Sequence, residues 1–576
     1  MISRLALRSS QGLALTSLAG AGSYTFHRTR MDSGETSLVV PTLEASLRAA
    51  RLLQTTALIV YDYQMHSWFE TNTHHEQERD AIETELQRAQ EVYTTESHKD
   101  LSPTERLEAK RHEKQAVQEA AEKLASLEVA VEDSRHVKPA QRLLQLCRTN
   151  GGVYIKVGQH LANLDYLIPQ EYIRALSELW DDAPQTSYEN VRAVIREELG
   201  EDPEVLFDSF DPEPLASASL AQVHVAYKDG QKLAVKVQHR GLKETSVGDI
   251  NALVSVVRWA ERWFDGFTWG WMADEIAPHL PKELNFVNEG NNAERAASAI
   301  AKTGLNCVIP KVLWDKTSAR VLTMEFEEGF KATDVGKIDE AGLKKVDVAK
   351  LISSVFASQV FLSAFVHCDP HPANVLLRAT KSGKPEMVLV DHGLYRELDD
   401  AFRLNYCRLW KNLMLADLKG IKDSCADLGV DETSYTLFAA ILTARPFDEL
   451  IERSKKGSLS TKVNPADKAD QVIIRGYAQR FVGKIFELLG SLPRQMLLLL
   501  KMNDCLRHID HALGSPANTL IVSGRFAADA LYENSFKDRA SWFKRWECWV
   551  EYMRMVVRIQ IYEIGARLLL AGTQQR

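Results

Sequence analysis

The most informative segment of this sequence reads His367-Cys368-Asp369-Pro370-His371-Pro372-Ala373-Asn374. Downstream, the apolar run Met387–Val390 predicts a buried strand, and Asp391-His392-Gly393 follows it directly. Carboxylate and amide oxygens are ligands that Mg²⁺ accepts, and phosphate groups commonly complete its coordination. We therefore predict that Asn374 and Asp391 hold Mg²⁺ beside a nucleotide, and that Asp369 is a catalytic residue.

A lysine upstream completes the arrangement. Lys236 lies in Leu233-Ala234-Val235-Lys236-Val237, whose alternation predicts a strand. A strand lysine, then Asp-x-x-x-x-Asn, then a carboxylate before Gly, is the order of the phosphate-binding and catalytic parts of protein kinases. There a helix carboxylate pairs with the lysine. Glu289 is the candidate for this catalytic partner and Glu283 is the alternative.

The order of the predicted elements gives the fold class. Helical patterning runs from Ala140 to about Glu198, a second strand pattern covers Arg320–Phe326, and the chain is mostly helical from Val348 onward. We predict an α+β, bilobal protein-kinase-like fold. It has a small β-containing N-lobe, a large helical C-lobe and a helical N-terminal extension.

The nucleotide-binding loop differs from that of ordinary kinases. In Pro214–His224, alanines stand where a Gly-rich loop would have glycines, and each added Cβ restricts the backbone. The main chain can still offer N–H groups to phosphate. Besides Lys236, the predicted nucleotide-binding residues are Ala216, Ser217, Ala218, Ser219, Leu220, Ala221, Gln222, Val223 and Glu325.

Further motifs make a family resemblance specific. Lys156-Val157-Gly158-Gln159 is followed by Leu167-Ile168-Pro169-Gln170-Glu171-Tyr172 and Leu179-Trp180-Asp181-Asp182-Ala183-Pro184. With the Ala-rich loop, they make the chain resemble the UbiB/aarF-domain (ADCK) atypical kinases over about residues 143–503. The segments that look most like the mitochondrial lipid-homeostasis branch are Asp391-His392-Gly393-Leu394-Tyr395, Leu492-Pro493-Arg494 and Lys501-Met502-Asn503-Asp504.

The resemblance implies gating motifs on the helical extension. Lys156, Gly158 and Gln159 would form the Lys-x-Gly-Gln motif, in an extension that covers the cleft where a peptide would bind. Opposite it the family has Glu-x-Asp, whereas this chain has Glu283-Leu284-Asn285. Asn285 can accept a hydrogen bond but carries no negative charge. Its replacement of Asp puts the gating role in doubt.

Composition narrows the class of protein. The 576 residues carry a net charge of −8, which argues against a dedicated nucleic-acid binder. Seven scattered cysteines without a Cys-x-x-Cys predict neither a disulfide framework nor a structural zinc site. No run reaches the length of a membrane span, and Leu351–Val366 is interpreted as a buried helix. Nothing in the sequence bears on oligomeric state.

The chain ends suggest targeting and a helical tail. The first acidic residue is Asp32, and Arg4, Arg8, Arg28 and Arg30 precede it, as in a mitochondrial transit segment. A tail from Trp542 to about Leu570 mixes aromatic residues with arginines, which suits either packing on the C-lobe or an interfacial membrane helix. Packing is the favoured interpretation.

We divide the chain into six regions. Residues 1–40 are a transit segment, and 41–140 are a helical region whose charged part, 70–138, is interpreted as a helical hairpin or a single solvated helix. The other regions are the helical extension 141–204, the kinase-like N-lobe 205–330, the kinase-like C-lobe 331–510 and the helical tail 511–576.

Three functions remain open. The first is a mitochondrial ATP- and Mg²⁺-dependent atypical kinase or ATPase. The resemblance implies a role in lipid or ubiquinone homeostasis, and an anionic membrane lipid or an isoprenoid or quinone-related ligand. The second is an ATP-gated switch or scaffold without turnover. The third is a true protein kinase.

Overall fold

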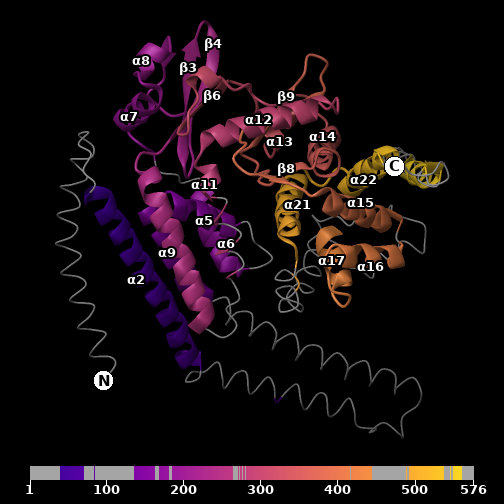
Figure 1. The fold of residues 1–576 in the computed structure, drawn as a ribbon, viewed down its shortest axis with the longest axis horizontal. Helices are drawn as coiled ribbons and strands as arrows, with labels where there is room; N and C mark the ends of the chain where they lie inside the picture. The colour runs from indigo at the N-terminus through magenta and orange to yellow at the C-terminus, as the bar shows by residue number, and fades with distance from the viewer. Residues whose placement is uncertain are drawn as a thin grey trace. The chain divides into compact units, whose positions relative to one another are not determined.

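The chain divides into two units in the computed structural model. The first unit comprises Met1–Pro184, Ala218–Leu220 and Gly241–Gly270, and the second comprises Gln185–Ser217, Ala221–Arg240 and Trp271–Arg576. The structure describes residues 39–70, 84, 135–162, 168–180, 185–263, 270, 273–274, 277–278, 280–415, 417–443, 488, 492–537, 545–546 and 549–560 (Figure 1).

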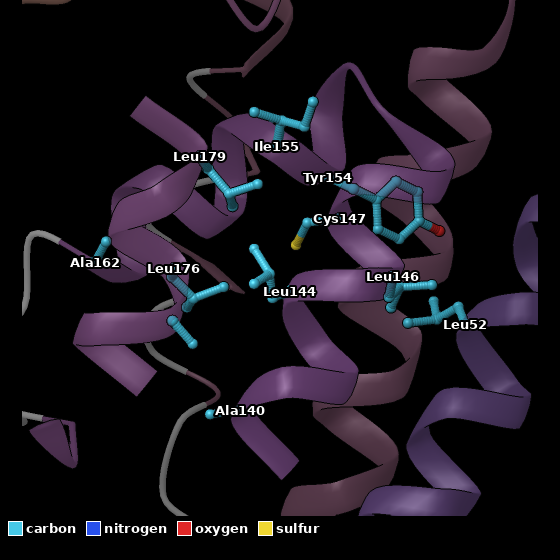
Figure 2. Close-up of a cluster of buried hydrophobic side chains, with 11 residues drawn as sticks. Leu52, Ala140, Leu144, Leu146, Cys147, Tyr154, Ile155, Ala162, Leu176 and Leu179 are labelled. Carbon is cyan, nitrogen blue, oxygen red and sulfur yellow. The ribbon is translucent and has the colours of Figure 1, made fainter. Parts of the chain in front are cut away.

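The described part of the first unit is helical. Its elements are α2 (Val39–Glu70), a helix over 135–150, α5 (Val153–Ala162), α6 (Gln170–Ser177), the 3-10 turn η1 (Glu178–Trp180) and α9 (Leu242–Trp263). A cluster of buried apolar side chains, among them Leu144, Cys147 and Leu176, forms the core between these helices (Figure 2). A buried ion pair joins α2 to α9, with Arg48 Nη2 2.6 Å from Asp249 Oδ2.

The second unit contains a small antiparallel sheet, which follows two helices along the chain. The strand order is β1-β3-β4-β6, and β2 pairs with β3; strands β3, β4 and β6 are labelled in Figure 1. Alternation along β4 buries Leu233, Val235 and Val237 on one face and places Lys236 on the other. The strands are β1 (Ser209–Phe210), β2 (Ala216–Ser217), β3 (Ala221–Lys228), β4 (Gln231–Gln238) and β6 (Val321–Glu325).

Two further small sheets follow in the second unit. One has the order β5-β10-β9-β7, antiparallel except for the β5–β10 pair, and the other pairs β8 with β11. Their strands are β5 (Cys307–Val308), β7 (Phe330–Lys331), β8 (Phe365–His367), β9 (Val375–Ala379), β10 (Pro385–Leu389) and β11 (Tyr395–Glu397).

Helices make up most of the rest of the second unit, and α22 packs on α14 and α15 (Figure 1). They are α7 (Tyr188–Leu199), α8 (Pro203–Leu206), α11 (Leu280–Glu283), α12 (Phe286–Ala301), α13 (Val335–Glu340), α14 (Lys345–Ala357), α15 (Asp400–Leu415), α16 (Leu418–Asp427), α17 (Tyr435–Thr443), α21 (Arg494–Ala512), α22 (Thr519–Lys537), a helix over 549–560, the 3-10 turn η2 (Trp314–Lys316) and the π-helical segment Ser358–Ser363.

One helical stretch in the described ranges has the length and composition of a membrane span. Lys345–Ser363 has a mean hydropathy of 1.3 over its apolar window, and 56% of that window is buried. Val348, Ile352, Val355 and Phe356 are fully or almost fully buried, and α14 contacts α22 and β10. This packing agrees with a core helix. The helix ends earlier than the predicted Leu351–Val366, because Ala364 adopts a left-handed φ of 57° and β8 follows.

The fold class is confirmed: a helix-rich α+β chain with small sheets. The predicted strands at Leu233–Val237, Arg320–Phe326 and Met387–Val390 correspond to β4, β6 and β10. None of the cysteines in the described ranges forms a disulfide. The transit segment up to residue 38 and nearly all of the charged insertion 70–138 lie outside the described residues, as does Asp181–Pro184.

The described part of the C-terminal tail packs on the helical lobe. Met555 and Ile559 are buried with Met414 of α15 and Ile521 of α22. Tyr552 stacks on Tyr532, with ring centroids 4.7 Å apart. One face of the helix over 549–560 therefore packs as expected, whereas Trp549, Met553 and Val557 on this helix are exposed.

Candidate active site

Two strand pairings bring the predicted metal ligands close to Asp369, the predicted catalytic residue. In the β9–β10 hairpin, Leu389 lies opposite Val375, and the Val390 N–H donates to the Asn374 carbonyl at 3.1 Å. Asn374 and Asp391 therefore lie at the same end of the hairpin. The Asn374 amide nitrogen donates to the Asp369 carbonyl at 3.1 Å, so its amide oxygen, the atom predicted to bind the metal, is not used in this bond.

The β8–β11 pair supports the same loop from the other side. Tyr395 lies opposite His367, and the Cys368 N–H donates to the Leu394 carbonyl at 3.1 Å. His367 Nε2 donates to the Asp391 carbonyl at 2.7 Å, while its Nδ1 accepts from the Asp369 N–H at 3.1 Å. A buried imidazole thus connects the main chains of Asp369 and Asp391.

Lys236 pairs with two carboxylates. Its Nζ lies 2.7 Å from Glu289 Oε1 and 3.0 Å from Asp391 Oδ2. The Glu289 side chain is 3% exposed, whereas that of Asp391 is 39% exposed, so Asp391 is the carboxylate that can also face a ligand. Glu289, and not the alternative Glu283, is the ion-pair partner of Lys236, as predicted.

Electrostatics keep this lysine charged. Burial alone would lower the pKa of Lys236, but the charges of Asp391 and Glu289 outweigh burial and hold the pKa above its usual value. Burial raises the pKa of Glu289, and Lys236 opposes that change. One ammonium is therefore shared by two carboxylates, an arrangement that favours the approach of a further cation.

Close packing of α12 positions Glu289. Phe286 and Ala293 on this helix are buried against strands β3 and β6. A Cβ on Gly290 would lie 2.8 Å from the Trp314 ring, so glycine allows the helix to approach that ring closely. Helix α12 also contacts the metal loop, because the Asn292 amide donates to the His392 carbonyl at 3.0 Å.

His392 occupies the middle of the predicted metal loop and is 2% exposed. Its Nε2 donates to the Leu389 carbonyl at 3.0 Å, and its Nδ1 accepts from the Tyr395 hydroxyl at 2.9 Å. Burial lowers the pKa of His392 to about 3, so the ring is neutral at physiological pH. The imidazole thus fixes the loop by hydrogen bonds as well as by packing.

Sequence reasoning missed one charged residue at this site. Lys501, on α21, is 7% exposed, and its Nζ lies 3.2 Å from Asp369 Oδ1. Lys501–Asp504 had been identified only as a segment that resembles the family. A signal was present: Lys501 directly follows the apolar run Leu497–Leu500, and a lysine in such a context is seldom buried unless it is paired.

The Ala-rich segment spans strand β2, the start of strand β3 and the link between them. Ala216 and Ser217 form β2, and Ala221, Gln222 and Val223 begin β3, whereas Ala218–Leu220 belong to the first unit. Ala221 is buried in the core beneath α12.

Gln222 has a structural task. Its side chain accepts from the Thr186 N–H at 2.8 Å, donates to the Thr186 carbonyl at 3.1 Å, and contacts His224 Nε2 at 2.8 Å. Because the Gln222 side chain is engaged in these bonds, a nucleotide would contact this residue through its main chain. Glu325 ends β6, with its N–H donating to the Lys311 carbonyl at 2.9 Å.

The Lys-x-Gly-Gln motif lies on α5 in the first unit. The Gln159 amide donates to the Leu179 carbonyl at 2.9 Å, which ties α5 to η1. Gly158 is buried at the same contact, whereas Lys156 is only partly buried. The Gly and Gln of the motif thus have a local packing function. The expectation that this extension covers the cleft stays a prediction.

Replacing Gly158 by Ala is expected to lower the free energy of unfolding by about 1 kcal/mol. The new Cβ would lie 2.5 Å from Leu179 Cδ1 and 3.1 Å from Cys147 Sγ. Overpacking of this kind costs about 1–3 kcal/mol, and the helical preference of Ala offsets about 1 kcal/mol. Urea unfolding of the full chain would measure the change.

Gly248→Ala on α9 is the matched control, because its Cβ would meet only Ala45 Cβ at 3.9 Å. This variant should be as stable as the wild type, or more so by up to about 1 kcal/mol. Equal stability of the two Ala variants would contradict a tight contact at Gly158.

The position where the family has Asp is a helix cap in this chain. Asn285 precedes α12, and its side-chain oxygen accepts from the Val287 N–H at 3.1 Å. Asn and Asp are about equally good at this position, so the substitution keeps the cap without the charge. Glu283 is 5% exposed at the end of α11.

The residues present suit a magnesium ion held together with a nucleotide. Among the described residues, no group of three or more His, Cys, Asp or Glu side chains is placed to hold a metal ion. Mg²⁺ does not require such a group, because it is commonly held by one or two side-chain oxygens, phosphates and water. Asn374 and Asp391, at one end of the β9–β10 hairpin, supply donors of that kind.

Known proteins share this sequence pattern. Residues 178–425 match the ABC1 atypical kinase-like domain. The chain is 40% identical to the mouse AarF domain-containing protein kinase 1 over 437 residues, which cover 75% of this chain and 82% of the mouse protein. It is also 40% identical to the Drosophila melanogaster AarF domain-containing kinase 1 over 388 residues, covering 67% and 73%.

Among solved structures, a Mycobacterium tuberculosis protein in complex with erythromycin matches with 21% identity and a TM-score of 0.39, over 67% of this chain and 97% of that one. The match to the ABC1 domain ends at residue 425, before Lys501. It includes Lys236, Glu289, Asp369, Asn374 and Asp391.

Proposed function

The chain belongs to the family of AarF domain-containing kinases, which carry an ABC1 atypical kinase-like domain, and from this premise we propose that it binds ATP with Mg²⁺ and catalyses phosphoryl transfer or ATP hydrolysis. The observation that carries the proposal is the Lys236 ammonium, 2.7 Å from Glu289 and 3.0 Å from Asp391. Strand pairing and the His367 side chain bring the main chains of Asn374 and Asp369 close to Asp391, which supports the proposal.

Each residue has a task in this reaction. Lys236, positioned by Glu289, holds the inner phosphates of ATP. Asn374 and Asp391 would hold Mg²⁺, which neutralises charge on the outer phosphates when bound. Asp369 accepts the proton of the attacking hydroxyl or water as the new O–P bond forms and ADP leaves.

The proposal extends to where the protein acts. We place it in the mitochondrion, in support of lipid or ubiquinone homeostasis, with an anionic membrane lipid or an isoprenoid or quinone-related compound as ligand. The arginine-rich, acid-free start of the chain and the family resemblance support this extension. ATP turnover of the full chain, measured with and without vesicles containing anionic phospholipid, tests the lipid part. A rate unchanged by lipid would count against it.

Replacing Asp369 by Asn tests for turnover. If Asp369 is the base, we expect turnover to fall by roughly 10²-fold while MgATP affinity stays within about twofold, because a general base acts on the proton and not on the nucleotide. ATPase rates and calorimetric MgATP binding on the full chain would be compared. Turnover equal to the wild type would remove Asp369 from the mechanism.

An ATP-gated switch is the second candidate. The Ala-rich segment favours this candidate. Its Gln222 side chain is engaged with Thr186, and its alanines lack the backbone freedom that glycines would have. A switch would bind MgATP tightly, change conformation and show no turnover under any condition. Transfer of phosphate to a defined protein, lost in Asp391→Ala, would instead indicate a true protein kinase.

A further inference from the structure

Helix α21 brings an ammonium group to the catalytic loop. Lys501 Nζ lies 3.2 Å from Asp369 Oδ1, and the two side chains are 9% and 18% exposed. A charged group removed from water to this extent requires an opposite charge or hydrogen bonds to offset its lost hydration. The Asp369 carboxylate provides that opposite charge.

Helix α21 holds this ammonium in a fixed position. Met496, Leu499 and Leu500, just before Lys501, are at most 1% exposed. Farther along the helix, Arg507 Nη2 donates to the Ile441 carbonyl at 2.7 Å and to the Leu442 carbonyl at 3.2 Å, both at the end of α17. The lysine is therefore attached to a packed element and not to a mobile surface.

Two imidazoles, those of His367 and His371, also lie near Asp369. Burial lowers the pKa of His367 on β8, and the Asp391 carbonyl and the nearby carboxylates offset only part of this. Burial also lowers the pKa of His371 in the loop, which Asp369 opposes, and the nearby His508, Lys331 and Lys501 lower it further. Burial thus favours the neutral form of both rings, and Lys501 Nζ is the ammonium group that pairs with Asp369.

We propose that Lys501 is a positioning residue for Asp369, whose carboxylate it holds in place in the catalytic loop through the 3.2 Å ion pair, so that α21 forms part of the active site. The proposal rests on the proposed function in one respect, because it assigns Asp369 as the base. It extends the active site beyond the residues that match the ABC1 domain.

The division of the effect between kcat and KM is the first test. In Lys501→Met, a side chain of similar length without the charge, Asp369 loses the ion pair that holds it in place. The kcat should then fall by roughly 10-fold or more, while KM for MgATP stays within about twofold. Lys501→Arg keeps the charge and should keep most of the wild-type kcat. A wild-type kcat in the Met variant would overturn the proposal.

The control is Lys411→Met. Lys411 lies in the same helical lobe and pairs with Glu551 at 2.9 Å, away from the catalytic loop. The kcat of this variant should stay within about twofold of the wild-type value. A loss of kcat as large as that of Lys501→Met would show that any lost lysine in this lobe has the same effect, and would also overturn the proposal.

A double-mutant cycle tests the pair without requiring turnover. Lys501→Met leaves the buried carboxylate without its cation, so the full chain should melt roughly 5 °C or more below the wild type. Adding Asp369→Asn removes that charge, and the double variant should regain most of the loss. Additive losses would overturn the proposal. Absence of turnover in the wild type would overturn the proposed function instead, and the cycle would still decide on the pair.

Discussion

Replacing Asp391 by Ala is expected to lower Mg²⁺-dependent ATP turnover by about 10³-fold or more while the chain stays folded. The carboxylate is the more exposed of the two partners of Lys236 and directly follows the β9–β10 hairpin that also positions Asn374. Its loss would remove the charged oxygen ligand of the ion, and charge on the outer phosphates would be poorly neutralised. Glu289, 2.7 Å from Lys236, would still neutralise the lysine.

The matched control for this variant is Glu397→Ala. Glu397 lies on the adjoining strand β11, is 66% exposed, and pairs with Arg295 at 2.7 Å. It should keep wild-type turnover. ATPase rates at saturating MgATP, with circular dichroism as the check on folding, would be measured for both variants. Wild-type turnover in Asp391→Ala would exclude Asp391 as the metal ligand, whereas equal losses in both variants would indicate a local folding defect.

Much of this site could be predicted from sequence because its residues lie next to regular elements. Lys236 alternates with buried residues on β4, and Asp391 comes just after the apolar strand β10. The alternation of apolar residues and the order of the motifs along the chain were therefore enough to predict both positions. Order alone did not separate Glu289 from the alternative Glu283, because both lie between Lys236 and Asp369. The structure decides for Glu289, which lies in the regular helix α12 and pairs with Lys236, whereas Glu283 lies in the short α11 before it.

Long-range packing could not be read from sequence in the same way. Lys501 meets Asp369 across many intervening residues, and no local pattern of α21 encodes that partner. Gln222 was assigned to the nucleotide with its neighbours, but its side chain is engaged with Thr186 in a distant segment. From sequence, Asn285 differed from the family's Asp only by its missing charge. Its role as the N-cap of α12 can be recognised only when the start of this helix is known.

Replacing Lys236 by Met is expected to weaken both folding and nucleotide binding. Glu289, with 3% of its side chain exposed, would lose the cation 2.7 Å away, which should lower the free energy of unfolding by about 3 kcal/mol. Burial already raises the pKa of Glu289, and without Lys236 protonation of this carboxyl becomes easier still. The folded state then binds the extra proton, so the deficit should shrink as pH falls from about 8 to about 5.

Nucleotide affinity separates the two consequences of this change. Loss of a charged donor to phosphate should weaken MgATP binding by roughly 10- to 100-fold. Adding Glu289→Gln removes the stranded charge, so the double variant should regain stability without regaining affinity. Lys232→Met is the control, since Lys232 lies on the same strand and face, but its Nζ contacts the exposed Glu328 carboxylate at 3.8 Å and the Phe326 ring instead of a buried carboxylate. Urea unfolding and calorimetry would measure both quantities, and a double variant that bound MgATP as the wild type does would show that Lys236 supports the fold and not the phosphates.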